Sequence, residues 1–98
     1  MSGEYKDMSG WYITPPDLLN AIPKERADLI EFRNEELTFV PPYFYRTEVE
    51  AETVLRKLLT EEEKAADSLL AKYPEARDTA RKSLEIAVAG LRLLNRKQ

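Results

Sequence analysis

The sequence predicts a mainly α-helical domain: a small antiparallel three-helix bundle, preceded by an aromatic and proline-rich segment at residues 11–46, called the aromatic segment below. Two observations indicate this fold class. The second half of the 98-residue chain has apolar residues at helical spacing, together with helix-start signals. The first half is interrupted by proline and contains eight of the nine aromatic residues. A chain of this length forms one domain, which we expect at residues 11–98 after a flexible leader at residues 1–10.

Proline marks the expected short helices of the aromatic segment. The run Thr14-Pro15-Pro16-Asp17 has a threonine cap, a proline in the first turn and a carboxylate three residues after the cap. It predicts a short helix over about 15–22. Pro23 interrupts that helix and is expected to begin a second one, in which Phe32 is an apolar position.

One short strand is expected after these helices. Residues 37–40 alternate weakly between apolar and polar side chains and favour an extended state, which Pro41 and Pro42 end. Residues 11–13 are the available pairing partner. The segment therefore forms at most a minor β-ribbon, which would be marginal without helices packed on it.

Three helices are expected from Thr47 onward. Thr47 and Thr60 are each followed three residues later by glutamate, the spacing of a capping box, and Pro74 suits the first position of a helix. The predicted helices are 48–59, 61–73 and 75–95, packed antiparallel. One helix from 48 to 73 is the alternative, because the apolar stripe keeps its phase. We favour a break at Thr60, since an unpaired carboxylate of Glu62 inside the stripe would be costly.

The last helix is predicted to have two apolar faces. The main face contains Ala76, Ala80, Leu84, Ala87, Leu91 and Leu94. Ile86 and Leu93 lie one heptad apart on a second stripe, close to Gly90. Glycine costs a helix interior about 1 kcal/mol relative to alanine, so we expect another backbone to approach there. That backbone belongs either to the aromatic segment or to a partner, and the partner is slightly favoured.

The composition excludes several kinds of functional site. The chain has no cysteine and no histidine, which excludes Cys/His zinc sites and Ser-His-Asp triads. It has no glycine-rich phosphate loop, and helix capping and the helix dipole explain its clustered glutamates. We therefore expect no catalytic residues, no metal site and no cofactor, in a protein that is not an enzyme.

Location is expected to be cytoplasmic, without a membrane partner. The longest apolar run, Ile86 to Leu91, is far shorter than the roughly 20 residues that a membrane span needs. The first residues lack the basic and then apolar pattern of a signal peptide. The net charge of -3 describes a small acidic protein.

Two groups of residues are candidates for binding. Rigid proline beside aromatic rings makes a surface that loses little entropy on contact, of the kind that anchors interfaces. The partner-binding candidates are Trp11, Tyr12, Tyr43, Phe44, Tyr45, Ile86 and Leu93. Cations on one helical face could follow phosphates. The candidates for phosphate contacts are Arg77, Arg81, Lys82 and Arg92.

One segment resembles a known family. Residues 39–52 combine proline and tyrosine in an extended piece that enters a helix through Arg46-Thr47-Glu48. This resembles the segment before the motor core of RecD-type DNA helicases. The likeness covers about one-seventh of the chain. The helicase motor and its nucleotide-binding loop are absent, and no functional residue is carried over.

The leading hypothesis is therefore a non-enzymatic protein-protein interaction module. It would be a small subunit, adaptor or inhibitor that docks on a larger protein, or a homodimer, because apolar and aromatic residues exceed what one thin bundle hides. The alternative is an accessory factor that binds nucleic acid through the basic C-terminal helix, which is the less favoured partner. Salt dependence separates the two, because phosphate contacts weaken steeply with salt.

Overall fold

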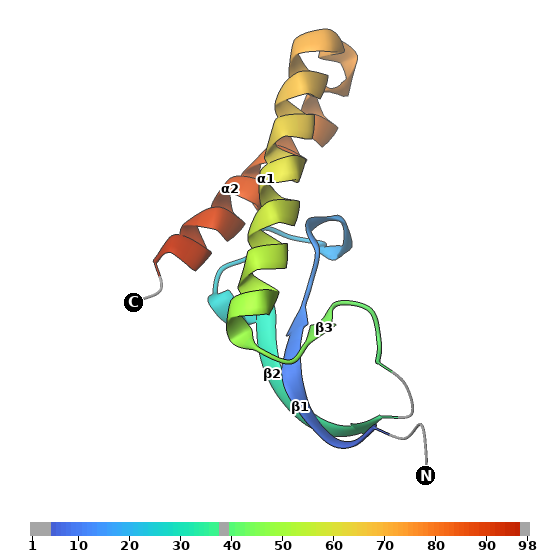
Figure 1. Cartoon of the computed structure of the whole chain (residues 1–98). Helices are drawn as coiled ribbons and strands as arrows, with labels where there is room; N and C mark the ends of the chain where they lie inside the picture. The colour runs from blue at the N-terminus through green and yellow to red at the C-terminus, as the bar shows by residue number, and fades with distance from the viewer. Residues whose placement is uncertain (1–4, 38–39, 97–98) are drawn as a thin grey trace.

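The molecule is a mixed α/β fold in which one long helix packs on one side of a three-stranded antiparallel sheet and a second long helix packs against the first (Figure 1). The computed structural model describes residues 5–37 and 40–96. Its elements are β1 (Tyr5–Ile13), η1 (Pro16–Leu18), η2 (Arg26–Asp28), β2 (Ile30–Leu37), β3 (Phe44–Tyr45), α1 (Glu48–Lys72), η3 (Pro74–Ala76) and α2 (Arg77–Asn95). The prediction of a three-helix bundle is wrong.

The sheet has the order β2-β1-β3. Ile13 lies opposite Ile30 and Trp11 opposite Phe32, so residues 11–13 do pair, but with the start of β2. The alternation Ile30-Glu31-Phe32-Arg33 has the period of two that a strand needs. The expected strand at 37–40 overlaps β2 only at Leu37, and residues 38–39 lie outside the described residues.

The two helices expected in the aromatic segment are single 3-10 turns. Pro16 starts η1, which ends at Leu18. The second turn, η2, is followed directly by β2, so Phe32 belongs to a strand and not to a helix. Residues 5–10, which we expected in a leader, form most of β1, while residues 1–4 lie outside the described residues.

Helix α1 runs without a break through Thr60. Thr47 caps its N-terminus, and its Oγ1 accepts a hydrogen bond from the backbone N–H of Glu50 at 3.2 Å. The predicted break rested on the cost of burying Glu62. In the structure Glu62 is only partly buried, because α1 extends past the sheet there and Glu62 lines an open groove. The alternative of one helix is therefore right.

The main core lies between the sheet and the helices. Its buried members are Ile13, Leu29, Ile30, Ala51, Leu55, Leu59, Leu93 and Leu94. Further along, the interface between α1 and α2 is built from small buried residues, among them Ala66, Ala80 and Ala87. Figure 1 shows this helical hairpin projecting beyond the sheet at one end, with the paired strands β1 and β2 extending at the other. The molecule measures 55 × 29 × 19 Å.

Candidate functional site

The register of the sheet divides its aromatic residues between two faces, because directly paired residues point to the same side. Phe32, Trp11 and Tyr45 stand opposite one another on β2, β1 and β3. We call these three residues the aromatic row. Trp11 and Tyr45 pack against the core under the helices, so the row lies on the face that α1 covers.

The aromatic row runs from the core out to solvent. The rings of Trp11 and Phe32 meet edge to face, with centroids 5.1 Å apart and planes at 63°. Trp11 and Tyr45 are half-buried, whereas Phe32 is 52% exposed at the edge of the sheet. An aromatic ring held by a packed neighbour and open to water on its other side can bind an apolar surface with little loss of entropy.

The opposite face of the sheet carries Tyr12, Phe44 and Arg33. The rings of Tyr12 and Phe44 lie 5.0 Å apart, and the guanidinium of Arg33 sits 5.1 Å from the centre of the Tyr12 ring. Phe44 is buried, with its ring over Gly10, where a side chain would collide with it. Phe44 therefore contributes to the packing of this face.

Arg33 is held by two carboxylates on its own strand. Its Nε donates to Glu31 at 3.0 Å and its Nη1 to Glu35 at 3.2 Å, which raises the pKa of Arg33. Burial and the Glu35 carboxylate raise the pKa of the Tyr12 phenol, against the opposing effect of Arg33. This face of β2 therefore carries a positively charged side chain, Arg33, between two acidic ones, Glu31 and Glu35.

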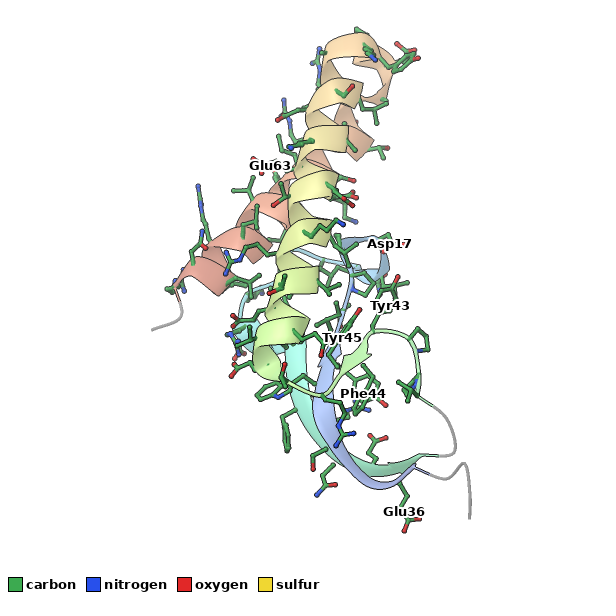
Figure 2. All side chains as sticks on the ribbon, in the orientation of Figure 1. Asp17, Glu36, Tyr43, Phe44, Tyr45 and Glu63 are labelled. Carbon is green, nitrogen blue, oxygen red and sulfur yellow. The ribbon has the colours of Figure 1, made fainter. Side chains whose placement is uncertain are left out.

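Tyr43 turns the chain from the double proline into β3. Its φ of 64° lies in the left-handed region, uncommon for a bulky residue, and its carbonyl accepts a hydrogen bond from the backbone N–H of Ile13 at 3.0 Å. Its side chain is 39% exposed. Figure 2 shows Tyr43 beneath Asp17 of η1 on one side of α1, with Glu63 on the other side of that helix.

A groove beside Tyr43 separates η1 from the two helices. It is lined by Pro16, Asp17 and Glu62, with Leu58 and Tyr43 at one end and Lys82, Ser83 and Ile86 at the other. Carboxylates from η1 and α1 and one ammonium from α2 thus line the same part of the groove.

Arg26 fixes the start of α1 to the turn before β2. Its Nη2 donates to the carboxylate of Glu48 at 2.7 Å and also to that of Glu52. Although burial opposes it, these two carboxylates raise the pKa of Arg26. The ion pair thereby sets where α1 lies over the sheet.

The structure does not gather the four candidate phosphate contacts into one patch. All four are exposed on α2: Arg77, Arg81, Lys82 and Arg92. Lys82 lines the groove that Asp17 and Glu62 also line. Arg92 lies about three turns from Arg81, and the exposed Glu85 is between them. The positive charge along α2 is therefore interrupted.

The predicted second stripe of the last helix is inside the molecule. Ile86 is 5% exposed and Leu93 8%, whereas Leu84 and Leu91 of the expected main face are only half-buried. A Cβ at Gly90 would lie 3.0 Å from the Leu59 methyl groups, so the close approach at this glycine comes from α1. Ile86 and Leu93 are thus not available on the surface of this chain.

Sequence reasoning missed Phe32 and the charges beside it as surface features. It assigned Phe32 to a helix, whereas only in a strand do its neighbours Glu31 and Arg33 lie together on the opposite face. The alternation from Ile30 to Arg33 was the signal that could have placed all of them on a strand.

Three further findings concern known kinds of site and known proteins. No helix in the described ranges has the length and apolar character that a membrane crossing requires. Across the same described residues there is no group of three or more acidic, histidine or cysteine side chains arranged to hold a metal ion. Comparisons with protein-family models, curated proteins and solved structures found no match to this chain, so the likeness to the helicase segment gains no support.

Proposed function

We propose that the protein is a non-enzymatic protein-interaction module that binds its partner through the exposed end of the aromatic row. The observation that carries this proposal is Phe32, which is 52% exposed and is held against Trp11 at 5.1 Å. Interface hot spots are enriched in aromatic residues that are rigid before binding. Because about half of Phe32 is already buried, burying the rest contributes about half of the roughly 1.5–3 kcal/mol that full burial of a large apolar side chain supplies.

Charge favours a protein partner over a nucleic acid. The side of β2 that carries Arg33 also carries Glu31 and Glu35, each within hydrogen-bonding distance of it. Such a mixed surface suits polar contacts at the rim of a protein interface and offers no continuous positive track for phosphates. The partner is a larger protein or a second copy of the chain. The lack of cysteine suits a cytoplasmic location, where disulfides are rare.

The test compares two exposed apolar residues. Phe32→Thr removes the ring and keeps a β-branched residue that suits a strand, and Leu18→Thr is the matched control at a 62% exposed position on η1. Proteins captured from the native host by the wild type are purified, and their affinities are measured by calorimetry. We expect Phe32→Thr to bind at least about tenfold more weakly, equivalent to about 1.4 kcal/mol, and Leu18→Thr to bind like the wild type.

Two results would contradict the proposal. In the first, Phe32→Thr retains the same partner with unchanged affinity while its thermal unfolding is also unchanged. In the second, the wild type retains only nucleic acid, and binding falls steeply as salt is added. That result would support the alternative of a nucleic-acid-associated factor.

A further inference from the structure

The outer edge of β2 is unpaired. β2 lies at one side of the sheet, and in the described residues its only strand partner is β1 on the other side (Figure 1). The strand is eight residues long. An exposed edge of this length is a template for another strand, and proteins usually protect such edges with charged side chains.

The hydrogen-bond phase shows which backbone groups this edge offers. The N–H of Thr14 donates to the carbonyl of Leu29 at 2.8 Å, which makes this pair a hydrogen-bonded one. Every second pair in the same register is then also hydrogen-bonded, and the pairs between them turn their N–H and C=O groups outward. Those outward groups belong to Ile30, Phe32 and Asn34.

The side chains of β2 are complementary to themselves in one antiparallel register. Suppose that two copies of β2 pair around Phe32. Each Phe32 then faces its counterpart on the α1 side of the sheet. On the other side, Glu31 faces the partner's Arg33, and Arg33 faces the partner's Glu31. Opposite charges in directly opposed positions stabilise a strand pair.

The neighbouring registers are not complementary. Pairing around Arg33 would set Arg33 against the partner's Arg33 and Glu31 against the partner's Glu35. Pairing around Asn34 sets Arg33 against the partner's Glu35, and by symmetry Glu35 against the partner's Arg33, but it also places each Phe32 against the partner's Glu36. Like charges directly opposite one another destabilise a sheet, so the charges that protect the edge also select one register.

We infer that the partner is a second copy of this chain, joined through antiparallel pairing of β2 centred on Phe32. The result is a continuous six-stranded sheet with two-fold symmetry, in which the exposed rings of the two aromatic rows bury each other. This inference rests on the proposed function, because it names the partner of the same aromatic surface.

The test uses charge reversal and mixing. Glu31→Arg and Arg33→Glu each place like charges opposite one another in the inferred register, so each variant should self-associate at least about tenfold more weakly than the wild type. An equimolar mixture of the two variants restores opposite charges in both positions and should form a heterodimer. Glu35→Gln is the control: it removes a contact of Arg33 within its own strand and leaves the inferred pairs intact. Sedimentation velocity measures the wild type, the three variants and the mixture from micromolar to submillimolar concentration.

The outcomes separate this inference from the proposed function. A wild type that stays monomeric throughout overturns the pairing, while capture of a different protein through Phe32 still supports the interaction module. Charge-reversal variants that dimerise like the wild type, or a mixture that fails to associate although both variants keep the native circular dichroism spectrum, also overturn it. If the Phe32→Thr variant no longer binds the captured proteins but self-associates like the wild type, the dimer interface lies elsewhere and the pairing of β2 is overturned.

Discussion

Gly10 is required by the ring that covers it. A Cβ built on Gly10 would lie 2.2 Å from Cζ of Phe44 and 2.8 Å from the carbonyl oxygen of Tyr45, so both a side chain and the backbone of β3 would have to move. Phe44 is one of the two residues that make β3, and it anchors this strand against Tyr12. The glycine therefore controls whether β3 can join the sheet.

We expect Gly10→Ala to destabilise the protein by about 1–3 kcal/mol, the usual cost of overpacking. Gly90→Ala is the matched control. Its Cβ would be 3.0 Å from the ends of the flexible Leu59 side chain, and alanine gains about 1 kcal/mol over glycine inside a helix. Its net effect should therefore be small. Urea denaturation of the two variants measures both; equal losses of stability would show that Phe44 does not pack over Gly10.

Among the secondary-structure elements, the unbroken helix α1 has the largest effect on the fold. Its N-terminal part buries Ala51, Leu55 and Leu59 against the sheet, and its C-terminal part packs on α2 and on the turn η3. Since no break intervenes at Thr60, the direction that the sheet and Arg26 give to the first turns also sets the direction of the projecting hairpin.

Glu61→Pro tests this continuity. In an uninterrupted helix, proline at this position removes a hydrogen bond and collides with the preceding turn, so we expect a loss of about 3 kcal/mol or more. If a helix began after Thr60, the same proline would occupy its first position and be tolerated. Val49→Pro, in the first turn of α1 at a 74% exposed position, is the control and should leave stability near that of the wild type. Denaturant titration followed by circular dichroism distinguishes the two cases.

The helices could be predicted from the sequence more fully than the sheet. The cap at Thr47, the helix-start signal at Pro74 and the apolar stripes depend on neighbouring residues. They located the start of α1 and the course of α2, although Pro74 begins the 3-10 turn η3 and α2 starts at Arg77. The error at Thr60 arose because the stripe alone does not reveal where the sheet ends and Glu62 meets a groove. β2 was missed because Leu29, Ile30 and Phe32 fit a helical period as well as a strand, and its partner β1 is distant in sequence.

The same limit applies to the candidate binding surface. Trp11 and Tyr45 were identified by their chemistry, but only strand pairing shows that Phe32 completes their row. Ile86 and Leu93 were expected on the surface because a helix with two apolar faces does not indicate which face meets α1. In the structure both faces take part in packing, since α2 contacts α1 and also the turns η1 and η2.

At the scale of the whole molecule, the shape is extended for a chain of this length. The radius of gyration is 15.7 Å, whereas a compact domain of this size has about 13 Å. The excess comes from the helical hairpin at one end and the paired strands β1 and β2 at the other (Figure 1). The two ends of the molecule have different interiors: Trp11 and Tyr45 pack against the core at the sheet, whereas alanines fill the helical hairpin.

Resistance to local opening should therefore decline along the long axis from the sheet to the tip of the helical hairpin. Around Leu55, Leu59 and Leu94, opening a helix exposes large buried side chains, whereas around Ala66 and Ala80 the buried side chains are single methyl groups and the leucines are already partly exposed. We expect the hairpin to open from its tip at Tyr73 while the sheet stays closed. Backbone amides of residues 66–72 and 77–84 should then exchange with deuterium well before those of residues 51–59, as followed by NMR. Equal protection along α1 would instead mean that the hairpin and the sheet unfold as one cooperative unit.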